Sequence, residues 1–421
     1  MLKGVALLGL CVACSTPSPP EQRARELSQE FVIVDGHVDV PFRLEELAQK
    51  GEPVDDVSKR TAKGDFDYER AREGGFDAPF MSIYTPAEAA DEGRSKALAD
   101  RLIDLVEELA RLSPQKFEMA RSAADVRRIA ASGRIAFLLG MENGSPLEGS
   151  LANLDHFHKR GVRYITLCHG KDNDICDSSY DKSRTHRGLT SFGREVVLRM
   201  NELGVLVDVS HISDDSFWQV IKLTRAPVIA SHSSMRYFVP GFERNISDEM
   251  VTAVGQNGGV VMINFGSSFL THEANEHMQQ RKELTQSIAA ELGLKADAPE
   301  VELRLAEWAE THPLPYARVA DVADHIDRAV RFAGIEHVGL GSDFDGVGDS
   351  LPVGLKSVAD YPNLIAELLR RGYSESDVRK ICGENVLRAL AAAAQVAHEL
   401  ERTVSHHIRP QAGAALVSLA Q

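Results

Sequence analysis

The feature that most constrains the fold is a repeated apolar run that ends in a polar or glycine-rich turn and is followed by a helical pattern. The runs are almost continuously apolar, as in IAFLLG, VLVDV and VVMINF, which is typical of strands buried on both faces of a parallel sheet. They lie at residues 31–40, 76–85, 134–143, 162–170, 205–211, 226–234, 259–266 and 337–346. Helical patterns lie between them at residues 97–112, 189–203, 214–223 and 319–332.

Alternating strands and helices of this number predict an α/β fold, a (β/α)8 TIM barrel of the metal-dependent hydrolase type. The alternative is a doubly wound open sheet, but no GxGxxG follows the first predicted strand, which disfavours a dinucleotide-binding fold. We expect the barrel domain at residues 21–396 and a C-terminal tail at residues 397–421. A charge-rich helical insertion at residues 267–316 is either a lid or subunit contact, or a solvated decoration.

The chain is acidic, with 47 Lys and Arg against 62 Asp and Glu, a formal net charge of −15 at pH 7. An acidic surface repels phosphate backbones, and the sequence holds no basic patch, so nucleic acid is not an expected partner. The hydrophobic content of 43% and charged content of 26% are those of a globular protein rather than a disordered chain.

Residues 1–20 have the layout of a secretory signal peptide with a short linker. Lys3 is followed by an apolar stretch at residues 4–13, which is too short to span a bilayer as a helix, and then by a Pro- and Ser-rich segment. Cys14 after this stretch resembles a bacterial lipobox, although Cys11 stands where that pattern usually has leucine. The resemblance implies a lipid anchor at Cys14 and export to the periplasmic side of the cell envelope. Simple secretion and an uncleaved anchor are the alternatives.

Three further cysteines follow, and three thiols cannot all pair within one chain. Cys168 and Cys176 are close enough in sequence to form a disulfide, but we expect buried or unpaired thiols in preference to this bridge. After Cys14, the sequence contains no CxxC pair and no four-cysteine zinc pattern.

Metal-ligand side chains stand at the carboxyl ends of six of the predicted strands. In DGHVD, at the end of the first strand, His37 and Asp39 are two residues apart and face the same side. A lone histidine is often a helix cap or a buried core residue, but the strand ends of a barrel converge on one small region. Imidazoles and carboxylates that converge in this way predict a zinc site. The side chains are His37, Asp39, Glu142, His169, His211, His232 and Asp343.

The chemistry of two-metal sites suggests a role for each of these residues. Two divalent cations about 3.5–4 Å apart need a bridging anion, and the carboxylate of Glu142 can give one oxygen to each. A water shared by both cations ionises near neutral pH, and the hydroxide can attack a carbonyl or phosphoryl centre. Asp343 is then the carboxylate available for proton transfer. The expected ligands are His37 and Asp39 for one cation, and His211 and His232 for the other.

Longer motifs carry a family resemblance. DGHVDVP, REGGFDAPFMSIY, GMENG, GVRYITLCH, DVSHIS, SHSSMR, GGVVMINF and HVGLGSDFDGV occur in order, and the matches run from about Phe31 to Leu390. The sequence resembles the membrane (renal-type) dipeptidases, the M19 peptidases. The resemblance implies a (β/α)8 enzyme with two Zn²⁺ ions per subunit, usually a homodimer. Family members hydrolyse dipeptides, often with a D-residue at the C-terminal position.

The resemblance also assigns site residues. His169 matches the histidine that contacts the substrate near the scissile carbonyl, and Asp343 matches the carboxylate that shuttles the proton. Arg244 matches the arginine that pairs with the C-terminal carboxylate of the dipeptide. Glu142 matches the bridging carboxylate, and the remaining metal ligands are His37, Asp39, His211 and His232.

Three departures from the family pattern stand out. Val38 replaces a common asparagine, at a position that points away from the metals. The spacing from His232 to Arg244 is one residue longer than in mammalian members, which makes Arg236 an alternative carboxylate partner. The loop GKDNDICDSS after His169 differs from the usual loop with Asn and Trp. Of all the family's properties, its preference for particular substrate side chains is therefore the one that the resemblance supports least.

Two other functions remain as alternatives. Lactonases, phosphotriesterases and deaminases of the amidohydrolase type often use HxH on the first strand and a carboxylated lysine as the bridge, whereas this chain has HxD and Glu142. A non-enzymatic lipoprotein that binds a metal or solute would not need Asp343 and His169 beside a complete set of ligands.

Overall fold

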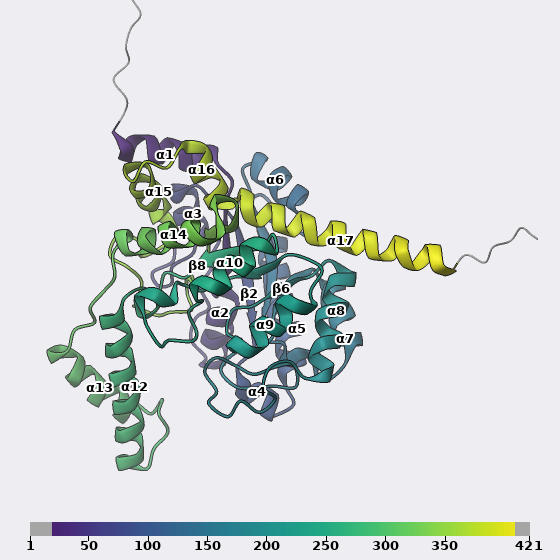
Figure 1. Cartoon of the computed structure of the whole chain (residues 1–421). Coiled ribbons are helices and arrows are strands. Elements are labelled where there is room, and N and C mark those ends of the chain that lie inside the picture. Colours follow the sequence, from purple (N-terminus) through teal and green to yellow (C-terminus); the bar gives the residue numbers. More distant parts are fainter. Residues whose placement is uncertain (1–18, 409–421) are drawn as a thin grey trace, which may run out of the picture.

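The computed structural model describes residues 19–408, and these residues form a closed parallel barrel surrounded by helices (Figure 1). β1 pairs with both β2 and β9, and β2 also pairs with β4, so the ring of eight strands closes. The TIM barrel predicted from the sequence is confirmed. The barrel strands are β1 (Ile33–Val38), β2 (Phe76–Tyr84), β4 (Ile135–Glu142), β5 (Val162–Thr166), β6 (Leu206–Asp208), β7 (Val228–Ala230), β8 (Val260–Ile263) and β9 (Val338–Leu340).

A further strand, β3 (Phe117–Met119), was not expected from the sequence. It pairs in parallel with β4 alone, from Phe117 opposite Ile135 to Met119 opposite Phe137, and so lies outside the ring. A strand of three residues has too short a pattern to stand out, and only its partner strand defines it.

The helices follow the strands as the alternating pattern predicts. Several begin at a hydroxyl cap directly after a βα loop: Thr190, Ser213 and Ser247 accept hydrogen bonds from the backbone N–H groups of the first turns of α8, α9 and α10. The helices are α1 (Pro20–Glu30), α2 (Val40–Gln49), α3 (Tyr68–Gly74), α4 (Ala87–Asp91), α5 (Ser95–Leu112), α6 (Ala123–Ala131), α7 (Leu151–Arg160), α8 (Ser191–Leu203), α9 (Asp214–Leu223), α10 (Asp248–Gln256), α11 (Ser267–Leu270), α12 (His272–Leu292), α13 (Pro299–Thr311), α14 (Val319–Ala333), α15 (Tyr361–Arg370), α16 (Glu375–Arg379) and α17 (Asn385–Ile408). Short 3₁₀ turns are η1 (Ser145–Leu147), η2 (Arg236–Phe238), η3 (Ile335–His337) and η4 (Val358–Asp360), and a π turn is η5 (Lys380–Glu384).

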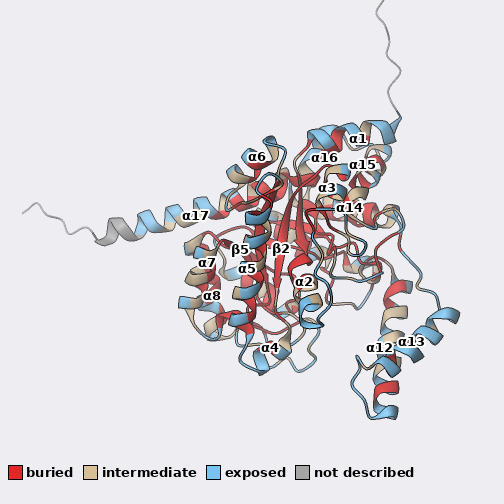
Figure 2. Cartoon of the chain, turned by 180° about the vertical axis from the view of Figure 1, so that it is seen from behind, coloured by how far each residue is buried: buried red, intermediate tan, exposed pale blue. Residues whose placement is uncertain are grey.

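The core has one layer inside the barrel and another between the barrel and its helices; the strands in the middle of Figure 2 are buried. Tyr164 on β5 fills the barrel interior because Gly140 on β4 has no side chain: a Cβ at Gly140 would lie 2.0 Å from the Cζ of Tyr164. The space that this glycine leaves lets the tyrosine hydroxyl reach the first strand from within the core.

Two helical segments extend away from the barrel body in Figures 1 and 2. The expected insertion contains α11, α12 and α13, and α12 and α13 share a small apolar cluster of their own. α17 is one continuous helix, so residue 397, where we expected the tail to begin, lies inside it. Cys14 and residues 1–18 of the expected signal peptide and linker lie outside the described residues, as do residues 409–421 of the tail, while Pro20, where the linker was expected to end, is the first residue of α1.

Within residues 19–408, no helix has the length and apolar character needed to cross a bilayer. Cys168, Cys176 and Cys382 are buried free thiols, so the structure has no bridge between Cys168 and Cys176. Burial raises the pKa of the Cys382 thiol to about 12, which keeps it protonated and unreactive.

Candidate metal centre

The side chains predicted to bind metal meet at the carboxyl ends of the barrel strands. Glu142, the last residue of β4, lies at the centre of the group. Its Oε1 is 3.1 Å from His211 Nε2, 3.3 Å from His232 Nε2 and 3.5 Å from His169 Nε2. Its Oε2 is 3.2 Å from Nε2 of His37. One carboxylate therefore faces four imidazoles from four other strand ends.

The donor atoms form three overlapping groups, in each of which all ligand atoms lie within 4.8 Å of one another. Glu142 belongs to two groups and His37 to two, so neighbouring cations would share ligands. Such sharing fits a two-metal cluster, in which one carboxylate bridges both ions. The groups are His37, Glu142 and His232; Glu142, His169 and His211; and His37, Asp39 and Asp343.

His37 is oriented for a cation by Tyr164. The Tyr164 hydroxyl is 3.0 Å from the carbonyl oxygen of Gly36 and 2.8 Å from Nδ1 of His37. Because the hydroxyl donates to the carbonyl, it accepts from Nδ1–H, and the lone pair of Nε2 is left to face Glu142. Nε2 of His37 is buried and has no hydrogen-bond partner among the described residues. An unpartnered nitrogen beside two carboxylates fits a metal ligand.

His232 has a similar support from a different strand. The Ser231 hydroxyl donates to Asp208 Oδ2 over 2.6 Å and accepts from the His232 Nδ1–H over 2.7 Å. These two hydrogen bonds again leave Nε2 of His232 facing Glu142, as the hydrogen-bond partners of metal-bound histidines do. Asp208 and Tyr164 were missed by the sequence reasoning. A buried carboxylate at the end of an apolar run was a signal for Asp208, but nothing local marked Tyr164.

The charges at the centre suit cation binding. Burial opposes ionisation of Glu142, but the attraction of His37 and His169 and hydrogen bonds from the other two histidines hold its pKa well below the usual range. Burial, together with nearby positive groups such as Arg244, lowers the pKa values of His211 and His232 well below their usual range. The ionised carboxylate of Glu142 and the neutral imidazoles of His211 and His232 are the forms that bind a metal. Although burial opposes it, Tyr164 and Glu142 raise the pKa of His37 well above its usual range, so His37 must give up a proton to bind a cation.

Asp343 and Asp39 form the acidic side of the centre. Asp343 Oδ2 accepts a hydrogen bond of 2.7 Å from the Asn264 side chain. Burial, and then repulsion from Asp39, raise the pKa of Asp343 to about 8, so it can hold a proton near neutral pH. His211 and Asp343 have φ angles of 69° and 64°, in the left-handed region that non-glycine residues rarely adopt. Backbone strain of this kind concentrates at functional sites.

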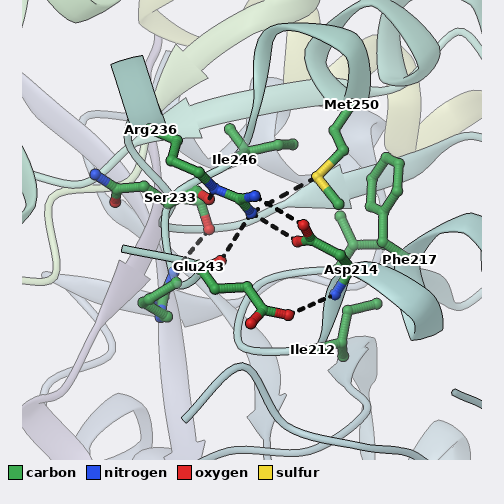
Figure 3. Close-up of a pocket in the computed structure, with 11 residues that line it drawn as sticks. Ile212, Asp214, Phe217, Ser233, Arg236, Glu243, Ile246 and Met250 are labelled. Carbon is green, nitrogen blue, oxygen red and sulfur yellow. Dashed lines mark hydrogen bonds and ion pairs between the residues drawn. The ribbon is translucent and has the colours of Figure 1, made fainter. Parts of the chain in front are cut away.

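Arg244 lies in the centre, whereas Arg236 does not. Arg244 is 3% exposed, and its guanidinium donates to the Ser233 hydroxyl, the His232 carbonyl oxygen and Nε2 of His211. Its Nε is buried without a hydrogen-bond partner among the described residues. Arg236, the alternative from the sequence, makes a bidentate pair with Asp214, with N–O distances of 2.6 and 2.7 Å (Figure 3). A buried guanidinium with unused donors fits an anionic ligand.

His325 on α14 holds the loop behind this centre. Its Nδ1 accepts the backbone N–H of Met235 at 2.8 Å, and its Nε2–H donates to the Leu270 carbonyl at 2.9 Å. The residue thus connects α14 to the loop after β7 and to α11. Both bonds need the neutral imidazole, and burial lowers the pKa of His325 to about 4.

We expect His325 to make the protein less stable in mild acid. Below its ordinary pKa of 6.5, the histidine of the unfolded chain takes up a proton that the folded chain resists until about pH 4. The free energy of unfolding should therefore decrease as the pH is lowered from about 6.5 to about 4, by about 3 kcal/mol in all. Denaturant titrations from pH 7 to 4 measure it. His325→Gln keeps one donor and one acceptor but does not titrate, and an equal acid loss in this variant would contradict the assignment.

Comparisons with known proteins agree with this geometry. The family model described as membrane dipeptidase, peptidase family M19, matches residues 21–404. Dipeptidase tcpJ of Claviceps purpurea is 32% identical over 375 residues, covering 86% of this chain and 77% of its own. The crystal structure of the probable dipeptidase PvdM from Pseudomonas aeruginosa has a TM-score of 0.75 and 28% identity, over 90% of this chain and 99% of that one.

A second solved structure, the metallopeptidase named dipeptidase AC, has a TM-score of 0.70 and 26% identity, over 86% of this chain and 98% of that chain. The family match covers nearly all of the described chain and includes every strand end that contributes to the centre. With its barrel and its cluster of metal-ligand side chains, the chain belongs to the membrane dipeptidase family, the M19 peptidases, and is a metallo-dipeptidase.

Proposed function

We propose that the chain is a two-zinc dipeptidase that cleaves L-Xaa–Xaa dipeptides and tolerates a D-residue at the C-terminal position. The observation that carries this proposal is the position of Glu142, whose two oxygens face different histidines 3.1–3.3 Å away while Arg244 lies beside the same cluster. The residues that would hold the ions are His37 and Asp39 on one side, His211 and His232 on the other, and Glu142 between them. Two bound Zn²⁺ ions would polarise the peptide carbonyl and make a shared water acidic.

The other side chains would do the remaining work. Arg244 pairs with the substrate carboxylate, which a guanidinium can bind through two hydrogen bonds. His169 is kept neutral, because burial lowers its pKa, and it lies at the centre to contact the scissile carbonyl oxygen. Asp343 takes the proton of the attacking water and passes it to the leaving amine. A longer peptide would place no carboxylate at Arg244, which restricts the enzyme to short substrates.

A dipeptide library assayed with the zinc-loaded protein tests this function directly. The library should carry L- and D-residues at each position, beside a lactone and a phosphotriester as probes of other two-metal hydrolases. Turnover of dipeptides with both L- and D-residues at the C-terminal position supports the proposal. Turnover of the lactone or the phosphotriester alone would overturn it.

Arg244→Ala should lower kcat/KM for dipeptides by about 100-fold, close to 3 kcal/mol, because a charged hydrogen-bonded contact is lost. Its zinc content should stay near that of the wild type, since arginine is not a ligand. Kinetics combined with metal analysis measure both. Arg163→Ala removes a half-buried guanidinium at the amino end of β5 and is the matched control. An equal loss of zinc in Arg244→Ala would count against the role.

Export, lipidation and assembly are further parts of the proposal. The short apolar stretch before Cys14 supports a lipid anchor on the periplasmic side of the cell envelope, and the family resemblance supports a homodimer. Mass spectrometry of the mature N-terminus, compared with a Cys14→Ser variant, tests the anchor. Light scattering of the soluble domain tests the dimer. An unmodified, uncleaved N-terminus would contradict the lipid anchor. A monomer at micromolar concentration would contradict the homodimer.

A further inference from the structure

Three aromatic rings follow one another around Arg244. The guanidinium carbon of Arg244 is 5.3 Å from the centre of the Phe269 ring, which is 5.7 Å from the ring of Phe242. Phe242 in turn is 6.2 Å from Tyr180, and Tyr180 is 6.0 Å from the ring of His211. We call Tyr180, Phe242 and Phe269 the aromatic wall. It runs from the buried arginine back to a predicted metal ligand.

The wall is open to a ligand. Tyr180 is 40% exposed, and Phe242 and Phe269 are half-buried, although Arg244 and His211 beside them are buried. Aromatic side chains that edge a polar centre without filling the core are typical of ligand sites, where they provide apolar contact area. Phe242 and Phe269 offer only apolar contact area, whereas the Tyr180 hydroxyl faces the Arg244 guanidinium.

Polar contacts hold the wall in place relative to Arg244. The backbone N–H of Tyr180 donates to the Ser178 hydroxyl over 3.1 Å, and Arg184 donates to the Ser178 carbonyl over 2.6 Å. Arg184 also forms an ion pair with Glu243, the residue before Arg244. The loop that carries Tyr180 is thereby connected to the segment that carries Phe242 and Arg244.

Glu243 is itself anchored. Its other carboxylate oxygen accepts the backbone N–H of Asp214 at the start of α9 over 2.9 Å, and the Glu243 backbone carbonyl accepts from Arg236 over 3.1 Å (Figure 3). These contacts determine where Tyr180 lies before any substrate arrives. A ring that is held in advance loses little conformational entropy on binding.

The position of Arg244 determines what would meet the wall. In a dipeptide, the C-terminal carboxylate and the side chain of the C-terminal residue are attached to the same carbon atom. If Arg244 takes the carboxylate, as the proposed function requires, that side chain must lie next to the rings around the guanidinium. We propose that Tyr180 is a specificity-determining residue that, with Phe242 and Phe269, forms an apolar subsite for the side chain of the substrate's C-terminal residue.

Two dipeptides that differ only in this side chain test the subsite. We expect the ratio of kcat/KM for L-Ala–L-Leu over L-Ala–Gly to fall about 10-fold in Tyr180→Ala, in the range known for apolar pockets that lose a contact. The ratio should be unchanged in Tyr180→Phe, which keeps the ring. Tyr237→Ala is the matched control, because Tyr237 is also exposed, at 60%, but stacks on Arg328 of α14. Its ratio should equal that of the wild type.

A ratio readout separates specificity from general damage. A structural defect would lower both rates together, and an unchanged ratio in Tyr180→Ala would overturn the subsite. Should Tyr180→Ala not fold, Phe242→Ala is measured instead. The same fall in the ratio of kcat/KM is expected for it, and an unchanged ratio would likewise overturn the subsite. A wild-type enzyme that cleaves neither dipeptide would instead refute the proposed function, and the subsite with it.

Discussion

Glu142→Gln should lower kcat/KM for dipeptides by about 10⁴-fold and deplete bound zinc, because two-metal catalysis requires a shared anion. In the structure, the two oxygens of Glu142 face His37 on one side and His211 on the other, at 3.2 and 3.1 Å. Glutamine has the same shape but carries no charge and offers only one acceptor oxygen. Kinetics with excess zinc, together with metal analysis after dialysis, measure the two effects.

The matched control is Glu148→Gln, a change of the same chemistry on an exposed residue six positions further along the chain. Glu148 accepts the backbone N–H of Lys96 and does not reach the centre. Its activity and zinc content should equal those of the wild type. If Glu142→Gln kept its zinc and more than a tenth of its activity, Glu142 would not be the bridging ligand.

Gly346→Ala should lower kcat/KM by about 10³-fold without unfolding the protein, because it displaces both Asp39 and Asp343, to which the proposed function gives metal binding and proton transfer. A Cβ on Gly346 would lie 2.2 Å from Asp39 Oδ2 and 2.3 Å from Asp343 Oδ1. These distances are too short for any contact, so one or both side chains must move. The φ angle of Gly346 is not positive, so the effect is steric and owes nothing to backbone strain.

Gly170→Ala provides the control, since Gly170 also lies in a βα loop of the barrel. A Cβ on Gly170 would have no atom of the described residues within 4 Å, apart from those of its own chain neighbours. This variant should retain wild-type kinetics. A melting temperature of Gly346→Ala close to the wild type would show that the fold survives. Wild-type turnover in Gly346→Ala would contradict the placement of Asp39 and Asp343 at the centre.

The sequence predicted the barrel strands because a strand buried on both faces requires a local run of apolar residues. The metal-ligand side chains were predictable for a related reason: each stands at or within three residues of a strand end, and the ends of parallel strands in a barrel must meet. β3 was missed because three residues carry no clear period. Asp208 was visible as a strand-end carboxylate, but its role required Ser231, from another strand, to be beside it.

The sequence alone did not decide whether Arg244 or Arg236 lies in the metal centre. Both arginines follow the sixth predicted strand; the family motif assigned the role to Arg244, but the longer spacing from His232 left Arg236 as an alternative. In the fold, Asp214 on α9 pairs with Arg236, while Arg244 reaches the metal-ligand cluster with unused donors. Tyr164 and Gly140 are a similar case, because the phenol reaches His37 only through the space that a glycine on the neighbouring strand leaves.

The chain's sequence alone therefore determined the barrel, the family resemblance and the residues that converge at its mouth, because apolar runs and strand-end motifs are local patterns. Only the tertiary structure decided which nitrogen of each histidine faces Glu142, which arginine is free to bind an anion, and which aromatic rings surround it. Each of these depends on a partner from another strand or loop, and hydrogen bonds and packing over a few ångströms exist only once the chain has folded.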